Sequence, residues 1–288
     1  MPDLRSASPA AQGLAPVHND ATAEIATALK QTPKYRNLCE ETLDRVARWA
    51  VARHGVRSEA TKAAKRKLHQ VYGAFFTKID FKGLDGLVRV LSESSTEDEI
   101  RRTCAMILQL HSSTAERIPI IEDLYPAIFR ETEWPETVVD LGCGLNPFAL
   151  PWMAFGREVT YRAYDIDARL ISCINEFLVR LGRPPAAECR DLLALHPKVA
   201  ADLVLLMKTL PSLERQEKGA SSRLLREIEA DYAIATFPAR SIGGREKGMA
   251  SHYDRFMRGI CDDLHIPVRR LDFPSEILYI CCLRERKG

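Results

Sequence analysis

The 288-residue sequence lacks any long uninterrupted run of apolar residues. Its longest apolar stretches, such as Leu203–Met207 and Ile277–Leu283, fall far short of the roughly 20 residues that a membrane-spanning helix needs. The first 18 residues are rich in Ala and Pro but lack the apolar core, roughly 7 to 15 residues long, of a secretory signal. We therefore expect no membrane segment, a disordered tail over residues 1–18 and a cytoplasmic location.

Metal-binding cysteine spacing and a strong overall charge are also missing. The eight cysteines include no C-x-x-C pair, which argues against a zinc site or a disulfide framework, so we expect reduced thiols and no metal. Basic and acidic residues nearly balance, 41 against 39, but residues 45–78 hold nine Lys or Arg and one acid, Glu59. This local excess indicates a polyanionic partner for that segment.

Residues 19–131 carry apolar side chains at three- and four-residue spacing, which predicts an all-helical domain. Ser58 is placed to cap a helix that runs through Leu68. Ser94 with Glu97 forms a predicted capping box for a later helix, and a last helix is expected over residues 115–129.

Residues 132–288 alternate short β-rich runs with helical segments, which is typical of βαβ units and a parallel sheet. The predicted strands are Thr137–Leu141, Thr160–Asp165, Ala187–Arg190, Leu203–Met207, Tyr232–Phe237, Val268–Phe273 and Glu276–Cys282, with helices over residues 168–181, 213–229 and 250–264. The last two strands are joined by a tight Pro274-Ser275 turn and must pair antiparallel. Six parallel strands and one antiparallel strand form the α/β, Rossmann-like seven-stranded sheet of class I methyltransferases.

Features at successive strand ends indicate a nucleoside-containing cofactor. The first strand runs into a turn with Gly142 and Gly144, where missing side chains let a ligand approach the backbone. Asp165 ends the second strand, where an acid in such folds binds a ribose diol. Asp191-Leu192 follows the third strand and suits an adenine ring, and Met207 ends the fourth.

Each of these residues alone is more simply explained as a turn glycine or a capping carboxylate. Their joint placement at the edge where open α/β sheets bind ligands favours the cofactor. A dinucleotide is disfavoured because Pro147 stands at the third glycine position of G-x-G-x-x-G.

Several motifs in this sequence point to one family. They are Lys67-Leu68-His69, Tyr72-Gly73-Ala74-Phe75, Cys143-Gly144-Leu145-Asn146-Pro147, Pro151-Trp152-Met153, Asp165-Ile166-Asp167-Ala168, Lys208-Thr209-Leu210-Pro211 and Lys247-Gly248-Met249. From about Ile25 to Ile280, the chain resembles the aminoglycoside-resistance 16S rRNA (guanine(1405)-N(7))-methyltransferases in motif order and spacing. One departure is Gly142, where many members carry Ala; we expect this change to leave the cofactor loop intact.

The resemblance implies two sets of site residues. Those implied to bind S-adenosyl-L-methionine are Phe75, His111, Ser112, Ser113, Arg117, Gly142, Gly144, Asp165, Asp191, Leu192, Met207 and Gln216. Those implied to position the target base are Lys208, Glu214, Arg245 and Glu276. Arg117 suits the methionine carboxylate because a guanidinium pairs with a carboxylate through two hydrogen bonds. Glu276 is equally explained as a salt-bridge partner at a strand end.

The resemblance also implies a partner, 16S rRNA in the assembled 30S ribosomal subunit, bound by a monomer. The helical domain over residues 19–131 would then dock on RNA through phosphate contacts, which position an enzyme without reading sequence. The candidate RNA-binding residues are Arg45, Arg48, Arg53, Arg57, Lys62, Lys65, Arg66, Lys67, Arg240 and Lys247. A basic helix face is also common on ordinary solvated surfaces.

The expected reaction is methylation of guanine N7, which confers aminoglycoside resistance in the family. Guanine N7 carries a lone pair and no proton, so no general base is expected, only positioning of the reactants. Two alternatives remain open at this point. One is a related rRNA methyltransferase with another target atom, such as adenine N1, and the other is a non-catalytic ribosome-binding protein.

Overall fold

The structure is a computed structural model that describes residues 15–55, 58–72, 79–156, 158–194, 200–239 and 249–286. Of the predicted site residues, Arg57, Phe75, Arg240, Arg245 and Lys247 lie outside these ranges. Within them, every helix is too short or too polar to cross a membrane.

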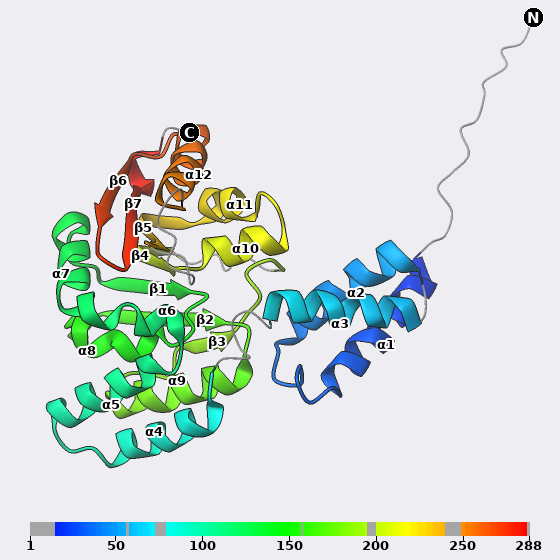
Figure 1. Cartoon of the computed structure of the whole chain (residues 1–288), viewed down its shortest axis with the longest axis horizontal. Helices are drawn as coiled ribbons and strands as arrows, with labels where there is room; N and C mark the ends of the chain where they lie inside the picture. The colour runs from blue at the N-terminus through cyan, green and yellow to red at the C-terminus, as the bar shows by residue number, and fades with distance from the viewer. Residues whose placement is uncertain are drawn as a thin grey trace, which may run out of the picture.

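A seven-stranded sheet forms the centre of the larger part of the molecule (Figure 1). The strands lie in the order β3-β2-β1-β4-β5-β7-β6, and β7 alone among them runs antiparallel to its neighbours. This arrangement confirms the predicted class I methyltransferase sheet. The strands are β1 (Thr137–Leu141), β2 (Thr160–Asp165), β3 (Ala187–Cys189), β4 (Ala200–Met207), β5 (Glu229–Pro238), β6 (Val268–Asp272) and β7 (Glu276–Cys282).

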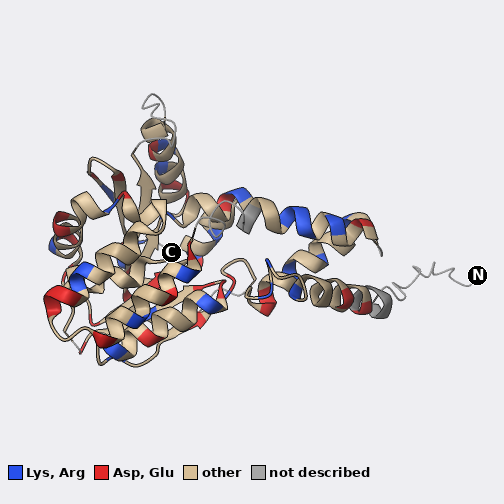
Figure 2. Ribbon diagram, turned by 60° about the horizontal axis from the view of Figure 1, so that its bottom comes forward, with Lys and Arg blue, Asp and Glu red and all other residues tan. Residues whose placement is uncertain are grey.

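Three N-terminal helices, α1 (Ala15–Lys30), α2 (Glu40–His54) and α3 (Ser58–Tyr72), lie to one side of the sheet and are called the α1–α3 unit below (Figure 1). They bury a core of their own, which includes Leu29, Leu43, Ala47 and Leu68. Lys and Arg are spread along the helices of this unit (Figure 2). Helix α1 begins before the predicted end of the tail at residue 18.

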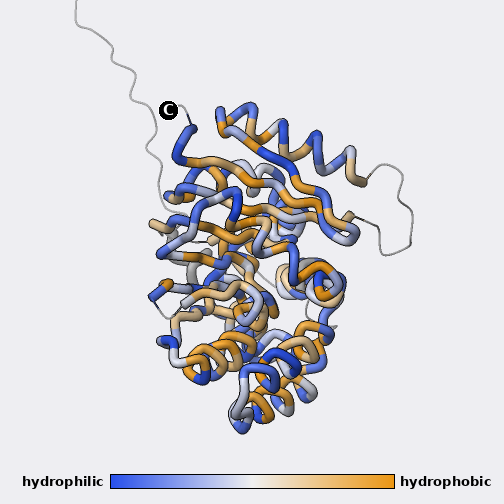
Figure 3. Tube along the Cα trace, turned by 90° about the vertical axis from the view of Figure 1, so that its left-hand side faces the viewer, coloured by the Kyte–Doolittle hydropathy of each residue, from blue (hydrophilic) through white to orange (hydrophobic). Residues whose placement is uncertain are grey.

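Two further cores lie on the two faces of the sheet, whose central strands are mainly hydrophobic (Figure 3). Neighbouring residues of β1 face opposite ways, because successive side chains of a strand alternate: Val138 belongs to one core and Val139 to the other. One face is covered by α4 (Phe81–Glu93), α5 (Glu97–Gln109), α7 (Ile121–Thr132), α8 (Leu150–Met153) and α9 (Ala168–Arg180). The other is covered by α10 (Leu210–Gln216), α11 (Ala220–Glu227) and α12 (Met249–Asp263). Short elements complete the described chain: α6 (Ser112–Ala115), η2 (Ile118–Ile120), η3 (Asn146–Ala149) and η4 (Leu283–Glu285).

The expected boundary between residues 131 and 132 does not coincide with a division between cores. Leu84, Ile107 and Leu124, from α4, α5 and α7, share one core with Val138 and Leu203 of the sheet. The helices of residues 19–131 therefore belong to two cores: the first three bury a core of their own, and the later ones pack against the sheet. Helical periodicity shows which face of a helix is apolar, but not which other element covers that face.

Two local predictions also differ from the structure. The capping box of α5 is formed by Thr96 and Glu99, while Ser94 ends α4 by bonding back to the carbonyl of Val90. The helix predicted over residues 213–229 is divided into α10 and α11, because Gly219 has a left-handed φ of 84°.

The α1–α3 unit is joined to the sheet by backbone hydrogen bonds as well as by side chains. The amide of Cys39 donates to the carbonyl of Ile166 at 2.9 Å, and the amide of Ala168 donates to the carbonyl of Asn37 at 2.7 Å. These bonds lie directly after Asp165, the acid that ends β2.

Candidate active site

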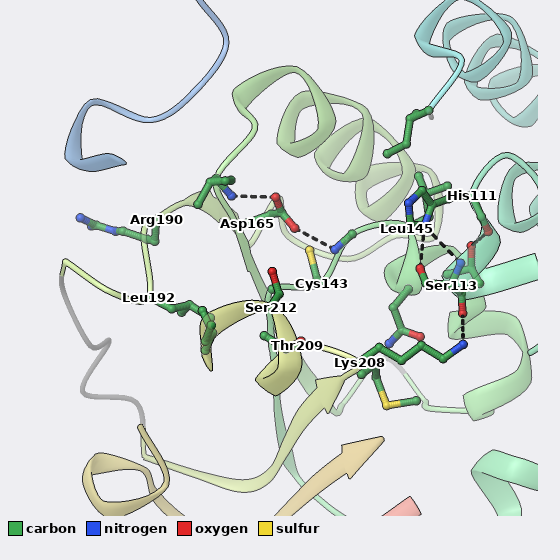
Figure 4. A pocket seen from close by; sticks show the side chains of 18 of the residues that line it. His111, Ser113, Cys143, Leu145, Asp165, Arg190, Leu192, Lys208, Thr209 and Ser212 are labelled. Atoms are coloured by element: carbon green, nitrogen blue, oxygen red, sulfur yellow. Dashed lines mark hydrogen bonds between the residues drawn. The ribbon is translucent and has the colours of Figure 1, made fainter. Parts of the chain in front are cut away.

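One pocket opens at the carboxyl ends of β1, β2 and β4, the edge where open α/β sheets bind ligands (Figure 4). Its lining includes all described residues predicted to bind the cofactor except Ser112. They are His111, Ser113, Arg117, Gly142, Gly144, Asp165, Asp191, Leu192, Met207 and Gln216. These residues come from sequence positions more than 100 apart, so the fold brings the predicted set together.

The glycine turn and Asp165 form one side of this pocket. Gly142 and Gly144 both have left-handed φ values, 66° and 51°. The amide of Gly144 donates to Asp165 Oδ2 at 2.9 Å, and the amide of Ile166 donates to Asp165 Oδ1 at 2.7 Å (Figure 4). Burial raises the pKa of the Asp165 carboxyl to about 6, although these amide hydrogen bonds oppose the shift.

Gly142 packs closely against Thr209, which leaves little room for a side chain at position 142. A Cβ there would lie 2.7 Å from Thr209 Cγ2, while a Cβ on Gly144 meets nothing within 4 Å. The Thr209 side chain cannot easily turn away because its hydroxyl donates to the carbonyl of Leu141 at 2.9 Å.

We expect Gly142→Ala to lower the free energy of unfolding by more than the roughly 1–3 kcal/mol that backbone strain alone costs a non-glycine residue at a left-handed φ, because its Cβ also meets Thr209. Gly144→Ala is the matched control, with similar backbone strain and no clash. Urea unfolding of both variants measures the difference. Equal losses in the two variants would show that the contact with Thr209 carries no cost.

A buried polar network lies beneath the pocket and holds Arg117. The Arg117 guanidinium donates from Nε to Glu276 Oε1 at 2.9 Å and from Nη1 to Asn146 Oδ1 at 2.5 Å. Asn146 in turn donates to Asp140 Oδ2 at 2.7 Å. Burial lowers the pKa of Arg117, but the charge and hydrogen bond of Glu276 together with the charges of Tyr125 and Asp140 outweigh it, so the pKa lies above its usual range. Burial raises the pKa of Asp140 to about 6.

Lys208 follows β4 at the mouth of the pocket and has a left-handed φ of 61°. Its Nζ donates to Glu116 Oε2 at 2.7 Å and to the carbonyl of Ser113 at 3.1 Å, and it lies 3.3 Å from Glu276 Oε1. A non-glycine residue at such a φ is strained, and such strain concentrates at functional sites. The contacts with Glu116, Ser113 and Glu276 hold the Lys208 ammonium in one position at the pocket (Figure 4).

Two residues that the resemblance implies position the target base, Glu276 and Glu214, have partners within the chain. Glu276 is completely buried and pairs with Arg117 and Lys208, as its alternative explanation as a salt-bridge partner supposed. Glu214 accepts hydrogen bonds from the amides of Gly219 and Ser221, at 2.6 and 3.2 Å, and so stabilises the start of α11. Neither residue lines the pocket.

The candidate RNA-binding residues fall into two groups. The exposed ones on α2 and α3 are Arg48, Arg53, Lys62, Lys65 and Arg66. Arg45 and Lys67 instead turn toward the methyltransferase domain: Arg45 pairs with Asp191, and Lys67 Nζ donates to the carbonyl of Gln216 at 2.9 Å.

The sequence assigned no role to Asn146, Glu116 or Thr209, although Asn146 and Thr209 stand in the motifs quoted above. Asn146 stands in the apolar run from Leu145 to Leu150, and such an isolated polar residue in a buried segment is a signal of a hydrogen-bonded role. Glu116 and Thr209 carry no such signal, since exposed acids and strand-end threonines are common.

The sheet order and the position of the pocket define the class I methyltransferase fold. A family model described as ribosomal RNA methyltransferase (FmrO) matches residues 31–280, and the chain belongs to this family.

Curated relatives and solved structures agree with this family. The 16S rRNA (guanine(1405)-N(7))-methyltransferase of Micromonospora rosea is 34% identical over 266 residues, which cover 91% of this chain and 97% of that protein. The enzyme of the same name from Proteus mirabilis is 33% identical, covering 89% and 95%. The structure of 16S rRNA methyltransferase RmtF in complex with S-adenosyl-L-homocysteine aligns with a TM-score of 0.78 and 32% identity, covering 93% of this chain and 99% of that one. The 16S rRNA methylase RmtB aligns with a TM-score of 0.74 and 26% identity over 93% and 98%.

Proposed function

We propose that this protein transfers a methyl group from S-adenosyl-L-methionine to N7 of guanine 1405 in 16S rRNA. The observation that carries the proposal is a pocket lined by ten of the twelve expected cofactor residues, in a chain whose relatives are named for this reaction. The pocket lies against Lys208, an ordered cation at the end of β4.

The pocket residues suit this cofactor in their chemistry. A buried acid, Asp165, follows β2 and suits a ribose diol, and the open space beside Gly144 admits a ligand close to the backbone. Asp191 and Leu192 supply an acceptor and an apolar surface for adenine, and Arg117 supplies a cation for the methionine carboxylate. When bound, S-adenosyl-L-methionine supplies a methyl group activated by a sulfonium ion.

The protein's own task is to position the reactants. Because guanine N7 has a lone pair and no proton, no residue is needed as a general base. Lys208, held by Glu116 and the carbonyl of Ser113, presents its charge at the pocket and orients the target base or its phosphates. Glu276 acts indirectly, by holding the side chains of Arg117 and Lys208 in position.

The raised pKa of Asp165 predicts a pH-dependent cofactor affinity. The ionised carboxylate is the better acceptor for a diol, so affinity is expected to be constant above about pH 7 and to fall up to tenfold per unit below the pKa of about 6. Calorimetric titration with S-adenosyl-L-homocysteine between pH 5 and 8 measures this. In Asp165→Asn the affinity should be weak at every pH; an unchanged slope in that variant would assign the titration to Asp140 instead.

We propose that the 30S subunit is bound through the exposed basic residues of α2 and α3, by a monomer. The triple charge reversal of Lys62, Lys65 and Arg66 to Glu is expected to abolish binding of 30S subunits at moderate salt, since lost phosphate contacts weaken binding steeply. Affinity for S-adenosyl-L-homocysteine should be unchanged. Filter binding at several salt concentrations gives the first result and calorimetry the second.

The matched control reverses three exposed basic residues on α4 and α5, Lys82, Arg89 and Arg102. It changes the net charge equally but is expected to keep 30S binding. Retained binding by the α3 variant would contradict the docking role, and equal losses in both would assign the effect to total charge rather than to α3.

The reaction itself is tested by incubating the purified protein with unmodified 30S subunits and S-adenosyl-L-methionine. N7-methylguanine is then mapped by borohydride and aniline strand scission. A single cleavage at guanine 1405 is the expected result. Methyl incorporation without cleavage would indicate another target atom, such as adenine N1, and subunit binding without incorporation would indicate a non-catalytic protein.

A methylated base carries an added positive charge, so cells expressing the protein should resist cationic aminoglycosides that bind at this guanine.

A further inference from the structure

Arg45 reaches from α2 into the pocket of the methyltransferase domain. Its side chain is 18% exposed and pairs with Asp191, whose side chain is 3% exposed. Arg45 Nε donates to Asp191 Oδ2 at 2.8 Å, and NH2 lies 2.7 Å from the same oxygen. NH2 also donates to Gln216 Oε1 at 3.1 Å. One arginine from the α1–α3 unit thus contacts two of the residues expected to bind the cofactor.

This contact determines how the Asp191 carboxylate faces the pocket. A carboxylate accepts about four hydrogen bonds, two on each oxygen. Arg45 occupies Oδ2, and the amide of Leu193 donates to Oδ1 at 2.8 Å. The carboxylate is therefore held from two sides and keeps acceptor capacity on Oδ1 for a donor in the pocket, such as the exocyclic amine of adenine.

Further contacts fasten the same end of the pocket to the α1–α3 unit. Glu41 of α2 accepts hydrogen bonds from the amide of Asp191 at 3.0 Å and from Arg190 NH1 at 2.9 Å. Lys67 of α3 donates to the carbonyl of Gln216. The loop after β3 and the end of α10 are thus both held by the α1–α3 unit.

We propose that Arg45 is a positioning residue for Asp191, and that through this pair cofactor binding and the seating of the α1–α3 unit on the methyltransferase domain strengthen each other. The proposal rests on the proposed function, because it takes the adenosine end of the cofactor to lie at Asp191. Coupling between two binding events is reciprocal, so an occupied pocket stabilises the seated unit, and a seated unit raises cofactor affinity. A cofactor-bound enzyme would therefore present its RNA-binding helices in a fixed position.

The first test is calorimetric titration of the full chain with S-adenosyl-L-homocysteine. Arg45→Ala is expected to bind about 10- to 100-fold more weakly, the loss that follows removal of a charge-assisted hydrogen bond. Arg45→Lys should recover part of the affinity, since an ammonium can pair with Asp191 but lacks the fork that also reaches Gln216. The control is Arg36→Ala, an exposed arginine between α1 and α2, which should bind as the unaltered chain does.

The second test is hydrogen exchange of the backbone amides of α2, measured with and without S-adenosyl-L-homocysteine. In the unaltered chain the ligand is expected to slow exchange in α2; in Arg45→Ala at saturating ligand this slowing should be lost. Unaltered exchange in α2, or full affinity in Arg45→Ala, would overturn the inference while leaving the proposed function in place. If the unaltered chain bound no ligand, the proposed function would fail and the inference with it.

Discussion

An Arg117→Ala variant is expected to bind no S-adenosyl-L-homocysteine and to lose about 3–5 kcal/mol of unfolding free energy. The guanidinium is 2% exposed, and its partner Glu276 is completely buried. Removing the arginine leaves the Glu276 carboxylate with Lys208 at 3.3 Å as its remaining partner and takes a donor from Asn146. Since whole domains are stable by only about 5–15 kcal/mol, this loss approaches the limit for folding. Thermal unfolding and calorimetric titration measure the two effects.

A double variant separates the two effects of losing Arg117. Replacing a complete buried ion pair by apolar residues of similar size is often neutral or stabilising, because no charge is left alone. Arg117→Met combined with Glu276→Met is therefore expected to recover most of the stability without recovering cofactor binding. Recovery of binding in the double variant would show that Arg117 acts on the fold and not on the ligand.

A Lys208→Ala variant is expected to lower kcat by about 100- to 1,000-fold, the usual effect of removing one preorganised charged donor at a reacting centre. Affinity for S-adenosyl-L-homocysteine should change little, because the expected cofactor contacts remain. Single-turnover methylation of 30S subunits measures the rate. The loss should appear in kcat rather than in KM for the cofactor, which distinguishes a role in the reaction from a role in binding.

Lys208→Gly is the matched control for the backbone at this position. Glycine relieves the strain of a φ of 61° and also removes the ammonium, so this variant should be as stable as the parent, yet as inactive as Lys208→Ala. Activity in either variant close to that of the parent would contradict the assigned role of Lys208.

Much of the fold follows from local sequence patterns. The bounds of β1, β2 and β7 agree with the structure because each is a short run rich in β-branched or aromatic residues. β4 and β5 extend further toward their N-terminal ends than predicted, since their first residues pair with each other, as Ala200 does with Glu229. Such pairing depends on both strands, so the sequence of one strand alone does not show where that strand begins. The split of the helical region has the same origin, because periodicity shows that a helix has an apolar face but not what covers it.

The pocket residues that sequence patterns alone predicted are those at or just after strand ends, whereas His111, Ser113 and Arg117 were implied by the family resemblance. Asp165 and Met207 lie in the pocket because parallel strands present their carboxyl ends at one edge. The partners of Arg45 and Glu214 within the chain were not predicted, because neither charge and helical spacing nor a family resemblance shows where a long side chain points. Arg45 lies 146 residues from Asp191 in sequence, and the pair exists through tertiary packing alone.

The backbone bonds between residues 37–39 and 166–168 bear on how far the chain can be shortened. A fragment that starts at residue 132 would carry the whole sheet, yet it would expose the amide of Ala168 and the carbonyl of Ile166 beside Asp165. It would also lack α4, α5 and nearly all of α7, so the apolar face of the sheet that these helices cover would be exposed to water. The smallest fragment that keeps these backbone bonds beside Asp165 must therefore begin before Asn37, and a shorter one is expected to aggregate.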